Sequence, residues 1–559
     1  MSAHKWSELV RVEVLFACGL ALALYYGRLG FMPLDQSIVF DGGWRILCGQ
    51  VPFRDYTAPN GFVPHAMQAL FFAAFGVTWF AYCMHAAVVN GLFVVLVDRL
   101  LAQFGLEAWA SSIFALCSAV VFYPAFGVPY MDQHAFFFSL AALVFAVAGA
   151  QSKDERAQLW CWLAVPPALA LAYLSKQIPS LFFVPVVIAV AVYAPNARGK
   201  ALLRLLLASI GVLLVLVVAA LVLRVDWHLV DAYWRRLPTE EGARRLAFVQ
   251  DSMLERFAET RRQLGLWSIT VVHALGLTAA LAACFGSITM LFRRDWPWAR
   301  AIASALVGEA LLVACLLFIA LTSNQKAIGM PFVFAGAGLV AAAAPALARV
   351  AAARGVAYAT AMGRVAVLAI AAVAVRDAWK FDREVVATRA VSDLQFDPAT
   401  VDVDSGALPG DLEFMRWSVP KNVAYSAQDL HDVAQFLCSQ SSAFFLLGDA
   451  SVLYGITRKP SIAPSLWFHP GLTVPLPQDP EFKRYEMELL QHIEKHRVRF
   501  VVLEGAHPWI GYQLNPGEKP PKAGYLTLDT FPKLAALVAA RKSGERDFGA
   551  FKVIELRAN

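Results

Sequence analysis

A group of ionisable residues follows directly after the first long apolar run of the chain. The stretch 34–61, LDQSIVFDGGWRILCGQVPFRDYTAPNG, contains Asp35, Asp41, Arg54 and Asp55. Carboxylates can act as general bases or hold a metal. Ionisable side chains next to lipid are costly, so they are by default a hypothesis of function. We therefore expect chemistry close to the point where the first apolar run ends.

Three later polar stretches also lie at the ends of apolar runs. YPAFGVPYMDQHAF carries Tyr130, Asp132 and His134, YLSKQIPS carries Lys176 and Gln177, and SNQKAIGMPF carries Asn324 and Lys326. A lysine at the lipid boundary can bind a lipid phosphate as a point charge. Acids and lysines on one face predict a single cavity, in which a carboxylate deprotonates a hydroxyl while a lysine stabilises a leaving lipid phosphate. A divalent metal on Asp35, Asp132 and His134 is an alternative that lacks a fixed ligand spacing.

Each of these residues also has a structural interpretation. Asp35 suits the N-cap of an interfacial helix near 37–48, and Asp41 before Gly-Gly suits a turn. Arg54 and Asp55 fit an ion pair within the loop as well as they fit a substrate contact. Lys176 at a helix end also fits a side chain that reaches the membrane surface.

Other polar residues of the apolar region have a structural interpretation first. Asp132 and His134 could pair with each other or with loop arginines. His85 and His273 lie inside apolar runs and are interpreted as hydrogen-bonded packing residues.

The elements that position these residues are long apolar runs. The 559 residues are 58% hydrophobic and 16% charged, whereas soluble chains carry about 25% charged residues. Runs near the length of ~20 residues that a bilayer requires occur at 9–28, 78–100, 109–127, 134–150, 159–175, 178–195, 201–224, 266–292, 300–322, 328–349 and 355–376. This pattern predicts an α-helical polytopic membrane protein with about eleven spans. The shorter run 61–76 predicts a helix in the membrane interface.

Charge predicts the orientation of the helices. Lys and Arg concentrate in the loops that follow the even-numbered runs, such as 151–158 and 196–204, so the positive-inside rule places the N-terminus in the cytoplasm. The net charge of +6 agrees with that bias and gives no reason to expect a nucleic-acid partner. We expect a multi-pass protein of a bacterial inner membrane.

The last third of the chain has the polarity of a soluble domain. It holds two short apolar runs, AFFLLG at 443–448 and RFVVLEG at 499–505, with the helical pattern EFKRYEMELLQHIEKH between them. We predict a membrane domain at 1–376, with its first outer loop at 29–77, and a periplasmic α/β domain at 377–559. Of the eight cysteines, Cys48 and Cys438 fall in polar segments, where a disulfide is an alternative to free thiols.

The first outer loop resembles that of the GT-C glycosyltransferases. The similar residues are Asp35-Gln36, then RILCGQVPFRDYTAPNG and GFVPHAMQALFFAAFG, with YMDQHAF and LAYLSKQ following. The group that it resembles is related to protein O-mannosyltransferases and lipid A aminoarabinose transferases. The resemblance covers most of residues 1–200, and it departs from the family at Gln36, where an acidic residue is usual.

The resemblance implies a function and roles for residues. It implies transfer of a sugar from a polyprenyl-phosphate donor to a glycan, lipid or protein acceptor outside the cytoplasm. Asp35 takes the place of the catalytic acid, Asp132 or Asp55 would supply a second carboxylate, and Lys176 would meet the phosphate. The residues that we predict to bind substrate are Arg54, Asp55, Tyr130, His134, Lys176, Gln177 and Lys326. Two other classes stay open: a transporter or lipid flippase, which needs polar residues near the middle of several helices, and a non-enzymatic assembly or sensor protein that binds through its tail.

Overall fold

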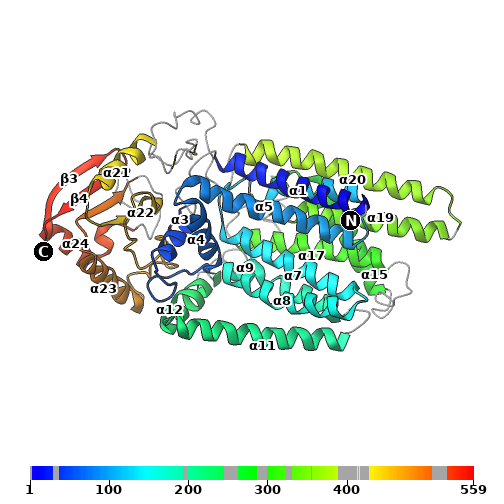
Figure 1. Ribbon diagram of the computed structural model, residues 1–559, viewed down its shortest axis with the longest axis horizontal. Helices are drawn as coiled ribbons and strands as arrows, with labels where there is room; N and C mark the ends of the chain where they lie inside the picture. The colour runs from blue at the N-terminus through cyan, green and yellow to red at the C-terminus, as the bar shows by residue number, and fades with distance from the viewer. Residues whose placement is uncertain are drawn as a thin grey trace.

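The structure is a computed structural model, and it describes residues 3–28, 37–192, 198–240, 242–243, 262, 264–285, 299–321, 330–353, 355–387, 412, 414–415, 427–505 and 526–558. Within these ranges the apolar runs form long helices that lie side by side (Figure 1). The apolar helices, long and short, are α1 Ala3–Gly27, α5 Trp79–Gln103, α6 Ala108–Phe122, α7 Met131–Gln151, α8 Glu155–Ser175, α10 Phe183–Val192, α11 Arg198–Val222, α15 Trp267–Phe285, α17 Ala299–Leu321, α19 Val333–Ala353 and α20 Ala359–Phe381.

The described part of the chain contains nine helices that are long and apolar enough to cross a membrane. Helix α6 and the stretch Gln177–Val192, which holds the short α9 Gln177–Ser180 and α10, are shorter apolar helices. The polytopic helical fold expected from the sequence is therefore confirmed. Helix α11 contributes no buried residue in its most apolar window, as expected for a helix whose sides meet lipid.

Short helices fill the space between the long helices and the C-terminal domain (Figure 1). These are α3 Ile38–Leu47, α4 Val63–Phe75, α12 Trp227–Val230 and the π-helical turn η1 Asp231–Arg236. Helix α4 covers the run that we expected in the membrane interface, and it packs against α3 and α5. Helix α20 continues through Phe381 into the turn η2 Asp382–Val386, so the predicted domain boundary at 376 falls inside this helix.

The C-terminal domain is built on a four-stranded sheet with the order β1-β2-β4-β3. Strands β1 Phe444–Leu447 and β2 Phe500–Glu504 are parallel and fully buried. The predicted helical pattern between them forms α23 Pro480–Lys495, preceded by α22 Val452–Ile456. Strands β4 Phe551–Leu556 and β3 Lys542–Phe548 form an antiparallel hairpin at the edge. Helices α21 Ala427–Ser439 and α24 Pro532–Arg541, with the 3₁₀ turn η6 Leu528–Thr530, complete the α/β domain.

The segments that we predicted to lie outside the cytoplasm share one end of the molecule. The loop after α3 contacts the C-terminal domain through Thr57, whose N–H donates to Pro464 O at 2.7 Å. Residues after α11 contact the same domain, because Arg236 pairs with Asp479 at 3.0 Å. The side of the membrane that this end faces stays a prediction.

Candidate functional site

Asp132 and Lys176, which come from two different polar stretches, form an ion pair. Lys176 Nζ lies 2.7 Å from Asp132 Oδ1 and 3.0 Å from Oδ2. The Asp132 side chain is fully buried, whereas the Lys176 side chain is 17% exposed. Lys176 Nζ also lies 5.6 Å from the centroid of the Phe318 ring in α17, within the range of a cation–π contact. The two predicted residues therefore meet in one place.

Helix ends set the geometry of this pair. Asp132 occupies the first turn of α7, where the positive end of the helix dipole favours a carboxylate. Lys176 is the C-cap residue of α8 and has extended backbone angles, φ −163° and ψ 134°. The chain thus leaves α8 at Lys176. Because an isolated charge at membrane depth is costly, pairing the two groups is what allows each to be there.

The first outer loop is attached to the end of α8 beside Lys176. Phe62 N–H donates to Leu174 O at 2.9 Å. Gly61 has a φ of +102°, and a Cβ there would lie 2.2 Å from Leu174 O, so only glycine fits this close approach. Gln177 Nε2 donates to Pro59 O at 3.1 Å. The loop backbone therefore rests directly on the residues that flank Lys176.

Gln177 also joins the loop to the segment after α11. Besides its contact with Pro59 O, the amide nitrogen of Gln177 donates to Trp234 O at 3.3 Å. Trp234 in turn stacks on Phe53, with ring centroids 5.5 Å apart. These contacts give Gln177 a role in holding two segments together, and its predicted role in binding substrate stays a prediction.

Arg54 and Asp55 pair within their loop. Arg54 Nη2 lies 2.6 Å from Asp55 Oδ2, and both side chains are more than a third exposed. Asp55 Oδ2 also accepts a hydrogen bond from Val51 N–H at 2.7 Å. Partial burial acts to raise the pKa of Asp55, but the hydrogen bonds from Arg54 and Val51 N–H outweigh it and the pKa lies below its ordinary value. The ion pair within the loop, which was the structural interpretation of Arg54 and Asp55, is therefore present. Their contact with substrate stays a prediction.

The side chains of His134 and Tyr130 are buried at the start of α7. His134 Nε2 lies 2.9 Å from His85 Nε2, and His85 Nδ1 lies 2.9 Å from Gln68 Oε1. His134 Nδ1 lies 2.7 Å from Tyr123 Oη and 2.9 Å from Tyr130 O. His134 is fully buried and Tyr130 is 2% exposed. His85 is thus hydrogen-bonded as expected, and the substrate roles predicted for His134 and Tyr130 stay predictions.

The structure gives no contacts for three positions named in the sequence analysis and no support for the metal site within the described residues. Asp35, Gln36 and Lys326 lie outside the described residues. Across the described ranges there is no group of three or more His, Cys, Asp or Glu side chains that could hold a metal ion. The side chains of Asp132 and His134 point to different partners, so a shared metal between these two has no support.

Asp41 and Arg45 form a buried ion pair that we did not expect from the sequence. Arg45 Nε donates to Asp41 Oδ2 at 2.8 Å, and the side chains are 1% and 0% exposed. The interpretation of Asp41 as a turn residue is therefore wrong, because the glycines after it lie inside α3. A Cβ on Gly42 would lie 2.5 Å from the His65 ring, so the glycine lets α4 pack closely. The sequence does contain an indication of this pair, because an acid and an arginine four residues apart are neighbours on a helix.

Burial perturbs the ionisation of Asp41. It raises the pKa of Asp41 above the ordinary value, although the charge of Arg45 and the hydrogen bond from Ser461 act to lower it. Ser461 belongs to the C-terminal domain, and its hydroxyl donates to Asp41 Oδ1. The outer loop and the C-terminal domain thus share one buried polar contact.

The segment after α11 makes its own contact with α23. Arg236 donates to both carboxylate oxygens of Asp479, at 3.0 and 3.2 Å, and His228 Nε2 lies 2.9 Å from Glu481 Oε2. Burial acts to raise the pKa of Asp479, but the hydrogen bonds from Arg236 and from Glu481 N–H outweigh it, so the pKa lies below its ordinary value. Two outer segments are therefore held by the same domain.

An apolar groove runs along the helices that carry the ion pair. It has a volume of about 430 Å³ and is lined by residues of α5, α7 and α8, among them Phe137, Phe138 and Leu171. Leu171 lies five residues before Lys176, and Phe137 lies five residues after Asp132. At 1.5 Å per helical residue, the near end of the groove is roughly 7–8 Å along the axes from the charged pair.

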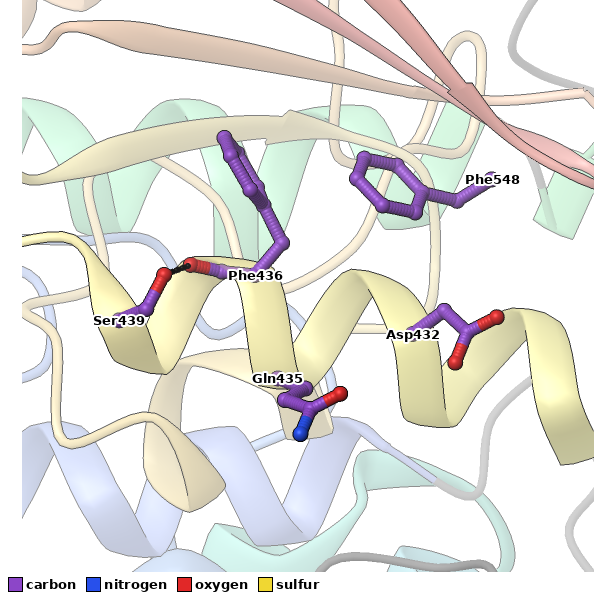
Figure 2. A pocket seen from close by; sticks show the side chains of 5 residues that line it. All are labelled: Asp432, Gln435, Phe436, Ser439 and Phe548. Carbon is purple, nitrogen blue, oxygen red and sulfur yellow. Dashed lines mark hydrogen bonds between the residues drawn. The ribbon is translucent and has the colours of Figure 1, made fainter.

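A second hollow lies on the surface of the C-terminal domain, between α21 and the end of β3. Figure 2 shows the rings of Phe436 and Phe548 on the same side of α21, with Asp432, Gln435 and Ser439 around them. The ring centroids are 5.3 Å apart, and the hollow has a volume of about 420 Å³. None of the residues predicted for the site lines it, so we assign it no part of the chemistry.

Comparison with known proteins gives structural matches alone. No family model matches the chain, and no curated protein matches it. The crystal structure of ArnT from Cupriavidus metallidurans in the apo state aligns with 99% of this chain and 98% of that one, at 17% identity and a TM-score of 0.42. The structure of the same protein bound to undecaprenyl phosphate aligns over the same shares, at 14% identity and a TM-score of 0.43. The chain is thus similar to these two ArnT structures over nearly its whole length.

Proposed function

We propose that this chain is an integral membrane glycosyltransferase that moves a sugar from a polyprenyl-phosphate donor to a glycan, lipid or protein acceptor outside the cytoplasm. The observation that carries the proposal is the Asp132–Lys176 pair at the helix ends, 2.7 Å apart and partly open through the lysine. An ammonium at that depth suits a lipid phosphate. The ArnT structure with undecaprenyl phosphate contains a lipid of this class.

The groove supports a donor with a long apolar tail. Its lining along α7 and α8 is apolar, and it ends about one and a half helical turns short of the pair. A polyprenyl chain seated there would lie in an apolar environment, with its phosphate directed towards Lys176. A water-soluble nucleotide sugar would gain nothing from such a groove.

The proposed reaction is a single displacement at the anomeric carbon of the sugar. The acceptor oxygen forms a bond to the anomeric carbon of the sugar while the bond from that carbon to the phosphate oxygen breaks. The electron pair of the broken bond leaves with the lipid phosphate, and Lys176 stabilises the charge that develops there. Asp35 takes the acceptor proton in the role implied by the resemblance. Attack opposite the leaving group inverts the anomeric carbon.

Asp132 acts through Lys176 in this scheme. Because both carboxylate oxygens lie within 3.0 Å of Nζ, Asp132 fixes the direction of the ammonium group. It also balances the charge of Lys176 before the donor binds. A lysine ammonium has three N–H donors, so a phosphate can be bound while one N–H still points to Asp132.

The test uses the full-length protein in lipid nanodiscs. A cell-envelope extract from a strain that lacks this protein supplies both donor and acceptor, and mass spectrometry follows loss of the polyprenyl-phosphate sugar and appearance of free polyprenyl phosphate. The wild type should consume a donor, and Lys176→Met should reduce its consumption by about 100-fold, the value of one strong hydrogen bond to a charged group. A wild type that consumes no lipid-linked sugar from such an extract would contradict the proposal.

The transporter or flippase alternative has one observation in its favour. His273 Nδ1 lies 2.6 Å from Glu309 Oε1, between α15 and α17, and Glu309 is at the middle of its helix. A lipid-translocation assay in liposomes separates the two. Translocation that survives Lys176→Met and fails in Glu309→Gln, without any loss of donor sugar, would favour the alternative.

A further inference from the structure

We propose that Arg45 is a positioning residue. By holding the C-terminal domain against the first outer loop, it sets the position of the loop backbone that contacts the residues flanking Lys176. The consequence for sugar transfer rests on the proposed function, whereas the mechanical link does not. Arg45 lies in α3, and its side chain is 1% exposed. Its guanidinium donates to Asp41 Oδ2 at 2.8 Å, to Ala463 O at 2.8 Å and to Ser465 O at 3.4 Å. One buried side chain thus joins the outer loop to the C-terminal domain.

The contact on the domain side is an extended segment between α22 and α23. Ser461 donates to Asp41 Oδ1, and Ser465 Oγ lies 2.8 Å from Tyr485 Oη in α23. Pro464 O accepts from Thr57 N–H at 2.7 Å. The segment 461–465 is therefore fixed to α23 on one side and to the outer loop on the other.

On the membrane side, the same loop contacts the end of α8. Five residues after Thr57, Phe62 N–H donates to Leu174 O at 2.9 Å, and Pro59 O accepts from Gln177 Nε2 at 3.1 Å. These two contacts lie on either side of Lys176 in sequence. The stretch 57–62 is thus held by the C-terminal domain at one end and by the residues around Lys176 at the other.

Arginine is the side chain that this junction requires. A guanidinium has five N–H donors in a planar fork, so it can bond a carboxylate and two carbonyls in different directions. It also stacks on the Tyr56 ring, with Cζ 5.0 Å from the centroid. A lysine at the same place would keep the charge that Asp41 needs, but its single nitrogen could not reach Ala463 O and Ser465 O together.

A purely structural role for Arg45 predicts a different outcome from a positioning role. If Arg45 only stabilises the fold, its loss should open the whole protein, and every lysine should react faster. If Arg45 positions the loop, Arg45→Lys should stay folded while the environment of Lys176 changes. The conservative variant is therefore the informative one.

The experiment measures how fast Lys176 reacts with an amine-specific acylating reagent in the full-length protein, by peptide mass spectrometry. Lys200 at the opposite end of the helices, 63% exposed, is the internal reference. We expect Arg45→Lys to raise the rate at Lys176 relative to Lys200 by about 5- to 10-fold, a typical coupling between linked sites. Ser461→Ala, which removes one contact of the same junction, should change the rate in the same direction and by less.

The matched control is Arg499→Met, an arginine change within the C-terminal domain. Arg499 bonds Leu556 O and pairs with Glu555 inside the sheet, so it leaves the junction intact. Equal rates at Lys176 in Arg45→Lys, Ser461→Ala and the wild type would overturn the proposal, as would a parallel rise at both lysines in the two junction variants. In a donor-turnover assay, Arg45→Lys should raise the donor KM more than it lowers kcat. A wild type without turnover refutes the proposed function and leaves the labelling result to decide the role of Arg45.

Discussion

The Asp132–Lys176 pair makes an asymmetric prediction about stability. Lys176→Met leaves a carboxylate that is fully buried without its counter-ion, because the Asp132 side chain has no exposed surface. Breaking a buried pair in this way costs about 3–5 kcal/mol. Asp132→Asn leaves an ammonium whose side chain is 17% exposed and whose long stem can turn the charge towards water or headgroups. We expect that variant to cost about 1–2 kcal/mol, less than half as much.

The double variant completes the cycle. Lys176→Met with Asp132→Asn removes both charges, so no uncompensated ion stays buried. Replacing a buried pair by neutral groups of similar volume is often close to neutral. The double variant should therefore be more stable than Lys176→Met alone by about 3–5 kcal/mol, so the costs of the two single changes should not add.

The assay is reversible unfolding of the purified protein in mixed detergent micelles, followed by circular dichroism. The same four proteins are then titrated with a polyprenyl phosphate, which separates stability from binding. Asp132→Asn should keep most of the affinity for the phosphate, because Lys176 remains, whereas the double variant should be stable and bind weakly. Equal costs for the two single variants, or a double variant as unstable as Lys176→Met, would refute the argument from burial.

Three further predictions follow from contacts elsewhere. Gly42→Ala should destabilise the protein by about 1–3 kcal/mol, because its Cβ would lie 2.5 Å from the packed histidine ring, whereas Gly211→Ala has nothing within 4 Å and should be neutral or slightly stabilising, as thermal unfolding will show. The lowered pKa of Asp479 means that it contributes stability at neutral pH and loses it as the pH falls through the folded pKa, below the ordinary 3.8. Hydrogen-exchange protection in the first turn of α23, relative to unstructured amides at the same pH, should therefore fall at acidic pH in the wild type and depend less on pH in Asp479→Asn. The side chains of Cys48 and Cys438 are exposed, so a maleimide should modify both without a reductant, and a disulfide between them would block this.

The long helices could be predicted because their length is set by the bilayer. The run predicted at 78–100 is α5, Trp79–Gln103, and the tail helix and two strands also lie where their patterns put them. The start of α7 was missed by three residues, since the run was expected from 134 and the helix begins at Met131. An aspartate among apolar residues indicates a loop by composition, yet the first turn of a helix accepts it through unpaired N–H groups.

The hairpin of β3 and β4 had no comparable pattern in the sequence. Strand β3, KSGERDF, is largely exposed along its length, and its charged residues protect an open sheet edge. Without alternating apolar residues, the sequence gives no period of two to detect. Its pairing with β4, whose residues are mostly buried, depends on the tertiary fold and not on local composition.

The location of the candidate site could be predicted from the sequence, but most of its side-chain contacts could not. Polar residues at helix ends predicted that acids and lysines from different loops would meet, and Asp132 and Lys176 do. The partner of each residue could not be predicted, because it depends on how the helix ends face one another. Arg45 was overlooked for the same reason: its partners Ala463 and Ser465 lie more than 400 positions away in sequence.

The polar composition of the first outer loop is explained mainly by its mechanical tasks. Asp41 and Arg45 neutralise each other inside a helix, Gly42 admits a side chain of α4, and Gly61 admits the carbonyl of Leu174. Such residues are as conspicuous in an apolar chain as catalytic ones, because burying any charge or closing any tight contact needs a special residue type. An ionisable residue next to a membrane segment therefore indicates a site only when its partner leaves it accessible. By that criterion Lys176, paired on one side and partly exposed on the other, has the stronger claim to chemistry than the fully enclosed Arg45.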